Sequence, residues 1–365
     1  MTDNKSIFVT KPVLPKRSDF DQYLDVIFSS GTLTNFGPLE QKLTSQLCDY
    51  LEVDNLLLVA NGTKALEVAV QTYCVENNIS KKNDFTFDTT PFSFAATSSA
   101  LDWIGLSCNF IDVNQFGTVD LRDFEPTRQN KSLLATNVYG NACDFDLINK
   151  TYGEMNVIYD SSHCFGVMRK NNILKQGYAN TLSFHATKVF TTCEGGAIIF
   201  KNKSSFELAK KLINFGISSP NEIIPHGTNA KLSELHAAYG LALLPSINSA
   251  LEARRSIGEF YLAELKNIGL SSLLIDTEMH RANFAYFPVL FPDEETLVRC
   301  ISALERLCIY PRRYFYPCLN GIGYDSSKDL PVADSLSSRV LCLPIYPGIE
   351  PHVAQAIVEV LSEFK

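Results

Sequence analysis

The stretch NLLLVANGTKALEVAVQTY, residues 55–73, decides the fold class of this 365-residue chain. It opens with an apolar run of strand length and turns at Gly62, and Leu66, Ala69 and Tyr73 then recur at helical spacing. A strand, a tight turn and a helix in succession are typical of an α/β domain. In such domains, backbone amides at the helix N-terminus lie at the edge of the sheet, where ligands bind.

Six more strand-like runs follow, separated by helical patterns: residues 84–90, 106–113, 132–138, 156–160, 181–185 and 196–200. Seven runs predict a large, mostly parallel sheet. Pro245 then interrupts a helical segment over residues 233–265, and we place a domain boundary there. This gives a large α/β domain with an N-terminal arm (1–245) and a smaller α+β domain (246–365), with strands within 284–291 and 341–348 and helices near 294–307 and 351–364.

Composition narrows the function classes. A net charge of -8 argues against a nucleic-acid or anionic-membrane surface, so small molecules are the expected partners. The chain shows no apolar run of membrane-spanning length and no signal peptide, which predicts a cytoplasmic protein. The ten cysteines form no C-x-x-C pair and the six histidines have no zinc-binding spacing, so we expect reduced thiols and no metal.

Three places could carry chemistry. The first is the turn at Gly62 and Thr63, whose amides and hydroxyl at a helix N-terminus have the form of a phosphate cradle. An ordinary helix cap is the alternative, and no P-loop or G-x-G-x-x-G pattern accompanies it.

The second is Asp160, at the end of an apolar strand, where a protonated heterocycle nitrogen would satisfy a buried carboxylate. A turn-capping Asp is the alternative there, and nearby His163 could donate to a ligand oxygen or be structural.

The third place is Lys188, an isolated lysine after another strand. A lysine captures a carbonyl best when its surroundings lower its pKa, although a solvated surface lysine is the usual alternative. Nearby hydroxyls could hold a phosphate without adding charge: Ser183, Thr187, Thr191 and Thr192. A phosphate cradle, an acid and a lysine at one edge of a sheet are the three groups that pyridoxal phosphate requires. They would bind its phosphate, its pyridine nitrogen and its aldehyde. Phe92 or Phe94 could lie on its ring, or pack in the core.

These segments resemble the DegT/DnrJ/EryC1/StrS family of nucleotide-sugar aminotransferases, which are fold type I pyridoxal phosphate enzymes. The resemblance covers nearly the whole chain, and the order and spacing of its motifs make it specific. It is carried by LTNFGPLE (33–40), NGTKAL (61–66), TPFSFAAT (90–97), VYGNACD (138–144), IYDSSHCFG (158–166), SFHATKVFTTCEGGA (183–197), GTNAKLSELHAAYG (227–240) and YPRRYFYP (310–317).

The resemblance implies a role for each matching residue. Lys188 would bind the cofactor aldehyde covalently and move a proton between substrate and cofactor, and Asp160 would pair with the ring nitrogen. His163 would lie by the ring hydroxyl and Phe94, rather than Phe92, on the ring. The phosphate would be bound by Gly62, Thr63, Lys64 through its backbone, and Ser183. Asn229 would reach the cofactor of a neighbouring subunit in a homodimer, and Tyr314 is a candidate for the substrate pocket.

The segment KVFTTCEGG (188–196) ends as in family members that act on 4-keto sugars. The resemblance therefore implies transfer of an amino group from glutamate to C4 of a dTDP-4-keto-6-deoxyhexose, giving a dTDP-4-amino-4,6-dideoxy sugar. A 3-keto substrate is one alternative and a non-catalytic, cofactor-binding sensor is another. The destination of the product stays open among lipopolysaccharide such as O-antigen, other glycans and secondary metabolites.

Overall fold

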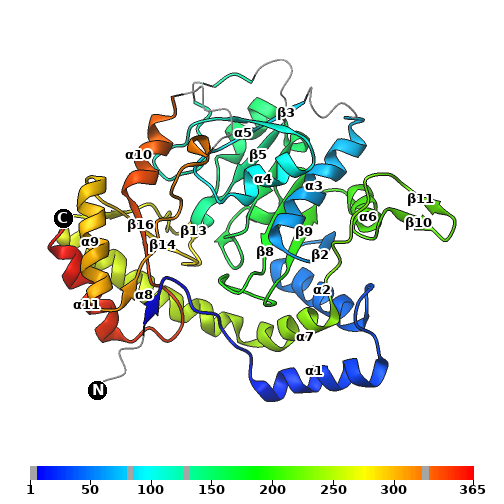
Figure 1. Cartoon of the computed structure of the whole chain (residues 1–365), viewed down its shortest axis with the longest axis horizontal. Coiled ribbons are helices and arrows are strands. Elements are labelled where there is room, and N and C mark those ends of the chain that lie inside the picture. The colour runs from blue at the N-terminus through cyan, green and yellow to red at the C-terminus, as the bar shows by residue number, and fades with distance from the viewer. Residues whose placement is uncertain (1–5, 80–84, 123, 127–131, 323–328) are drawn as a thin grey trace.

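The computed structural model of the protein describes residues 6–79, 85–122, 124–126, 132–322 and 329–365. A seven-stranded sheet lies at its centre with helices around it (Figure 1). In sheet order its strands are β2 (Leu56–Val59), β9 (Gly196–Phe200), β8 (Ala179–Ser183), β6 (Val157–Asp160), β5 (Leu133–Thr136), β3 (Thr86–Thr89) and β4 (Ser107–Phe110). Only β9 runs opposite to the others in this sheet. The predicted seven-stranded, mostly parallel sheet is confirmed; Asp84, the first residue of one predicted run, lies outside the described residues.

Side chains alternate between the two faces of the sheet, so each strand contributes to two separate apolar clusters. One face buries Leu57, Leu134 and Ile158 against α3 (Gly62–Glu76), α4 (Ala96–Trp103) and α6 (Lys203–Leu212). The other face buries alternate strand residues with α2 (Pro38–Leu51), α5 (Phe145–Tyr152) and α7 (Glu234–Leu243). This layered packing fixes the strand ends from which the polar residues project.

The helical segment is interrupted at Pro245, as predicted: a short 3-10 helix, Leu244–Ser246, separates α7 from α8 (Ile247–Ile268). Beyond it, a three-stranded antiparallel sheet of order β12-β14-β16 packs with helices. Its elements are β12 (Ser271–Ser272), β14 (Phe287–Leu290), β16 (Val340–Leu343), α9 (Glu294–Arg306), α10 (Pro331–Arg339) and α11 (Pro351–Ser362). The apolar cluster on the α2, α5 and α7 side continues into this part. The domain boundary itself stays a prediction.

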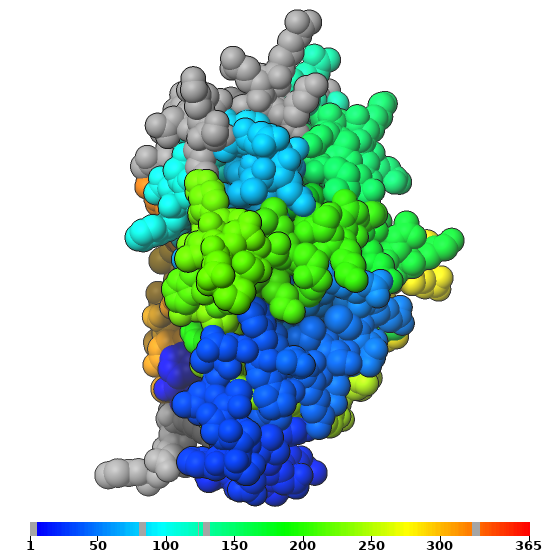
Figure 2. Space-filling model, turned by 90° about the vertical axis from the view of Figure 1, so that its right-hand side faces the viewer, coloured from blue at the N-terminus to red at the C-terminus, as the bar shows by residue number. Residues whose placement is uncertain are grey.

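Short strands tie distant segments together. The N-terminal β1 (Ile7–Phe8) pairs with β15 (Ile309–Tyr310), so the N-terminal arm lies against the C-terminal part. Strand β7 (Met168–Arg169) likewise pairs with β13 (His280–Arg281). Helix α1 (Arg17–Ser30) and the hairpin of β10 (Ile217–Ser219) and β11 (Glu222–Ile223) lie at the periphery. Figure 2 shows the face that carries them, with residues 6–60 in blue and the segment around residue 210 in green.

All ten cysteines are among the described residues and carry free thiols. Within the described ranges, no helix has both the length and the apolar character to cross a membrane.

Candidate active site

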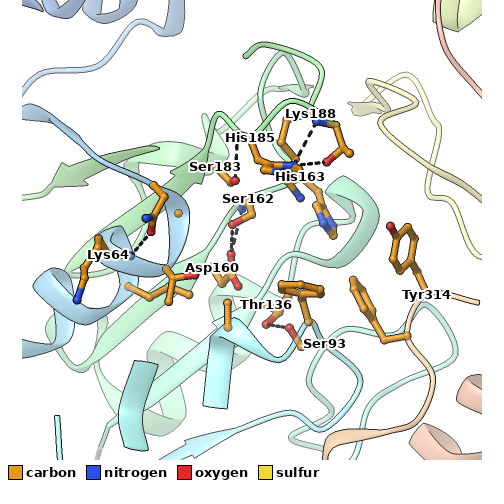
Figure 3. Close-up of a pocket in the computed structure, with 18 of the residues that line it drawn as sticks. Lys64, Ser93, Thr136, Asp160, Ser162, His163, Ser183, His185, Lys188 and Tyr314 are labelled. Atoms are coloured by element: carbon orange, nitrogen blue, oxygen red, sulfur yellow. Dashed lines mark hydrogen bonds between the residues drawn. The ribbon is translucent and has the colours of Figure 1, made fainter. Parts of the chain in front are cut away.

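A cavity of about 530 Å³ opens at the carboxyl edge of the central sheet (Figure 3). The end of β6 places Asp160 there, the end of β8 places Ser183 there, and α3 begins beside them. Nine predicted site residues line this one cavity: Gly62, Thr63, Lys64, Phe94, Asp160, His163, Ser183, Lys188 and Tyr314. The structure therefore brings together segments that lie more than 250 residues apart in the chain.

The N-terminus of α3 forms one wall. Asn61 caps the helix, because its side chain accepts a hydrogen bond of 2.8 Å from the Lys64 amide. Helix geometry leaves the amides of Gly62 and Thr63 without intrahelical partners, so they can bind an anion. A Cβ on Gly62 would lie only 2.8 Å from the Ser183 Cβ, so glycine allows β8 to approach this closely. The Lys64 amide, predicted as a phosphate ligand, is already engaged by Asn61, which leaves Gly62, Thr63 and Ser183 as the stronger cradle.

Asp160 is buried, with 5% of its surface exposed. Its Oδ1 accepts hydrogen bonds from the Ser162 amide (3.1 Å) and hydroxyl (2.6 Å), and its Oδ2 accepts one from Thr97 Oγ1 (3.0 Å). Among the described residues, no lysine, arginine or histidine forms an ion pair with it. A buried carboxylate of this kind is suited to a cationic N–H of a ligand, which would supply the missing countercharge.

A chain of buried hydroxyls supports Asp160 from behind. Ser93 Oγ lies 2.7 Å from Thr97 Oγ1 and 3.1 Å from Thr136 Oγ1, and Thr97 in turn donates to Asp160. In the segment of residues 89–97, sequence reasoning assigned a role only to the two phenylalanines and missed these hydroxyls. The spacing of Ser93 and Thr97, four residues apart across the start of a helix, was the available signal.

Lys188 lines the cavity from the loop that follows β8. Burial lowers the pKa of Lys188 to about 8, and the negative charge of Asp160 opposes this shift without cancelling it. Its Nζ lies 5.5 Å from the centre of the Tyr286 ring. Near pH 8 about half of the lysine side chains are therefore neutral amines, which is the form that attacks a carbonyl carbon.

His163 is buried beside Lys188, with 7% of its surface exposed. The Tyr139 amide donates to its Nδ1 over 3.0 Å, so the neutral ring carries its proton on Nε2. Burial, assisted by the positive charge of Lys188, holds the pKa of His163 well below its usual value. The ring lies parallel to Phe315, with 6.0 Å between ring centres. His163 can therefore donate from Nε2 to a ligand oxygen, and it stays uncharged.

The two candidate phenylalanines separate clearly. Phe92 is fully buried in the core, whereas Phe94 is 58% exposed and lines the cavity. Tyr314 also lines it, as does Phe315, which was not predicted. Asn229 lies outside the cavity, is exposed, and accepts a hydrogen bond from Lys231 Nζ (3.0 Å).

The expectation that Thr191 and Thr192 hold a phosphate is wrong. Both are buried, and they donate to the backbone oxygens of Phe184 (2.9 Å) and Glu194 (2.7 Å). Their hydroxyls shape the loop that carries Lys188 and do not reach the cavity. Of the four predicted hydroxyls, Ser183 and Thr187 line it. Among the described residues, no group of three or more His, Cys, Asp or Glu side chains is placed to hold a metal ion.

Comparison with known proteins gives the same picture. Residues 16–362 match the family model described as the DegT/DnrJ/EryC1/StrS aminotransferase family. The chain is 36% identical to a dTDP-4-amino-4,6-dideoxy-D-glucose transaminase of Shigella dysenteriae, over 99% of this chain and 100% of that protein. It is 33% identical to a protein of the same name from Escherichia coli, over 98% and 99%. The solved structure of a putative PLP-dependent aminotransferase from Bacillus cereus superposes with a TM-score of 0.83 at 25% identity, covering 98% of this chain and 100% of that one.

The cavity fits pyridoxal phosphate group by group. The free amides of α3 suit its phosphate, the carboxylate of Asp160 suits its ring nitrogen, and the amine of Lys188 suits its aldehyde. Site geometry and the full-length family match agree, so pyridoxal phosphate is the cofactor of this protein. The chain belongs to the DegT/DnrJ/EryC1/StrS aminotransferase family.

Proposed function

We propose that the protein transfers an amino group from glutamate to C4 of a dTDP-4-keto-6-deoxyhexose, giving a dTDP-4-amino-4,6-dideoxy sugar. The observation that carries the transaminase chemistry is that Asp160, Lys188 and the N-terminus of α3 line a single cavity. The substrate is inferred from two relatives, at 36% and 33% identity over nearly their whole lengths, that are named for this product.

Bound pyridoxal phosphate supplies an aldehyde that takes up an amino group and a protonated ring that accepts electrons. The chain's own residues hold it in place. The amides of Gly62 and Thr63 would bind the phosphate, and Asp160 would keep the ring nitrogen protonated through a charge-assisted hydrogen bond. The Nε2–H of His163 would donate to the ring oxygen, and Phe94 would lie on the ring face.

Lys188 has two tasks in this proposal. Its neutral amine would hold the cofactor between turnovers, and its Nζ would move a proton between the substrate carbon and the cofactor. The pKa of about 8 suits both tasks, because a base with a pKa close to the working pH exchanges protons in both directions.

We also infer that the active form is a homodimer. Asn229 is exposed and lies outside the cavity of its own chain, as expected for a residue that serves a partner's cofactor. Large apolar side chains are exposed on α1 and on the β10–β11 hairpin: Phe28 is 85% exposed and Ile223 is 72% exposed. A second copy of the chain would cover such surfaces.

We place the protein in the cytoplasm, because all ten of its cysteines are free thiols, six of them buried, and reduced thiols are typical of that compartment. Its amino sugar would then serve a surface glycan such as O-antigen lipopolysaccharide. Glutamate as the amino donor is part of the same proposal.

The test is to incubate the loaded enzyme with glutamate and, in turn, keto-sugar nucleotides that differ in nucleotide and in keto position. We expect an amine from the dTDP-4-keto-6-deoxy sugar, and NMR of the product should place nitrogen on C4. Nitrogen on C3 would contradict the proposed regiochemistry. Absence of any amine, with glutamate or with other amino acids as donor, would contradict the transaminase proposal.

A further inference from the structure

A second cavity, of about 410 Å³, adjoins the first. The two cavities share four wall residues: Ser93, Phe94, Tyr314 and Phe315. The second cavity extends from these residues toward the chain around residues 312–322, on the side away from α3. A ligand with one end at Lys188 could therefore place its other end in the second cavity.

The second cavity is positively charged, although the protein as a whole carries a charge of -8. Arg312 and Arg313 line it, and none of its lining residues is an aspartate or glutamate. Arg313 is already paired, because its Nη2 donates to Glu294 (2.6 Å) and to the Ser338 carbonyl (3.1 Å). Arg312 is exposed and forms no ion pair with any described residue.

The backbone of Arg312 is held firmly. Its amide donates to the Cys342 carbonyl (3.1 Å), and the Cys342 amide donates back to the Arg312 carbonyl (2.8 Å). Cys342 is fully buried in β16, so this bridge anchors Arg312 to the small sheet. Its guanidinium lies 5.9 Å from the centre of the Tyr314 ring, which belongs to both cavities. Arg312 is thus a cation on a fixed backbone at the junction of the two cavities, where it contacts Tyr314 and has no carboxylate partner among the described residues.

We propose that Arg312 binds the diphosphate of a nucleoside diphosphate sugar and that the second cavity holds this part of the substrate. The inference rests on the proposed function. When the cofactor and the keto carbon of the sugar occupy the first cavity at Lys188, the second cavity offers adjoining space for the diphosphate, because the two cavities share wall residues. A guanidinium forms paired hydrogen bonds with phosphate oxygens, and a cavity without carboxylates does not repel them.

The test uses the loaded enzyme and three variants: Arg312→Gln, Arg312→Lys and the control Arg306→Gln. Arg306 is an exposed arginine on α9 that lines neither cavity. Calorimetric titration with dTDP, and in parallel with UDP and GDP, measures nucleotide binding without any turnover. A separate measurement follows the change in cofactor absorbance when glutamate is added, which needs no nucleotide.

We expect Arg312→Gln to weaken nucleoside diphosphate binding by roughly tenfold or more, since a charge-assisted hydrogen bond is lost. Arg312→Lys should weaken it less, Arg306→Gln should not change it, and the glutamate reaction should proceed at the wild-type rate in all three. Wild-type affinity in Arg312→Gln would overturn the inference, as would no binding of any of the three nucleotides to wild type. An equal loss of nucleotide binding and glutamate reaction would also overturn it, because Arg312 would then act on the whole site.

The outcome separates this inference from the function on which it rests. A wild-type protein that aminates no keto-sugar nucleotide, but binds a nucleoside diphosphate through Arg312, would refute the proposed function and support this inference. If the wild-type protein is an active transaminase and Arg312→Gln binds nucleoside diphosphates with wild-type affinity, the proposed function is supported and this inference is refuted.

Discussion

Thr97 and Asp160 lie 63 residues apart in the chain, and the Thr97 hydroxyl donates a hydrogen bond of 3.0 Å to Asp160 Oδ2. Thr97 is fully buried at the start of α4, and Asp160 is the last residue of β6. The amide and hydroxyl of Ser162 both donate to Oδ1 of Asp160, so they do not fix the position of Oδ2. Thr97 donates to Oδ2 and fixes the position of that oxygen. The carboxylate that we assign to the cofactor ring is therefore fixed by residues from two separate segments.

Replacing Thr97 by valine keeps its shape and removes the donor. We expect Thr97→Val to weaken binding of pyridoxal phosphate by roughly tenfold, since a hydrogen bond to a charged group is worth about 1.5–3 kcal/mol. Thr97→Ser should restore most of the affinity, and Asp160→Asn should lose more than Thr97→Val. Absorbance titration of the cofactor-free protein measures each dissociation constant. Equal affinities in Thr97→Val and wild type would show that this hydroxyl does not position Asp160.

The lowered pKa of Lys188 predicts a dependence of stability on pH. Burial disfavours the charged amine, so the folded protein holds this proton only below about pH 8, whereas the unfolded chain holds it up to about 10.5. Lys188 therefore destabilises the cofactor-free protein below pH 8, by up to about 3 kcal/mol, and this penalty is relieved as the pH rises from 8 to 10.5.

Lys188→Met should accordingly be more stable than wild type at pH 7, because it removes the buried charge. Urea unfolding of both cofactor-free proteins at pH 7 and pH 10 measures the difference in free energy of unfolding. We expect the advantage of the variant to shrink at pH 10. If the difference in free energy of unfolding between the two proteins is the same at both pH values, burial does not destabilise the charged form of Lys188 in the folded protein.

Adding a side chain at Gly62 should cause a steric clash. A Cβ at this position would lie 2.8 Å from the Ser183 Cβ, so Gly62→Ala must push the start of α3 away from the end of β8. We expect at least a roughly tenfold loss of cofactor affinity, because amides displaced from the phosphate form weaker hydrogen bonds. Gly321→Ala is the matched control, since a Cβ there meets no atom within 4 Å. Unchanged affinity in Gly62→Ala would remove this turn from the phosphate site.

The sequence was most informative where a pattern is local. Apolar runs bounded by turns located all seven strands of the central sheet, and the break at Pro245 was visible because proline cannot continue a helix. Asp160, at the end of one of those strands, and Lys188, after another, were predicted to meet because the ends of parallel strands share one edge. The structure places both in one cavity.

Contacts between distant segments could not be predicted in this way. The pairing of β1 with β15 leaves no periodic signal, and neither does the hydroxyl contact between Ser93 and Thr136. Thr191 and Thr192 were misassigned for a related reason: a hydroxyl beside a lysine can face a ligand or a backbone carbonyl, and only the path of the loop decides which. Arg312 likewise could not be distinguished from an ordinary surface arginine, because the second cavity that it lines is formed by segments distant in the chain.

The central claim is that Lys188 is the amine that binds pyridoxal phosphate, and it can be tested directly. The loaded enzyme is reduced with borohydride, digested, and analysed by mass spectrometry to find the lysine that carries the cofactor. We predict the added mass on the peptide that contains Lys188, and none in Lys188→Ala. A cofactor attached to another lysine, Lys64 for example, would contradict the account.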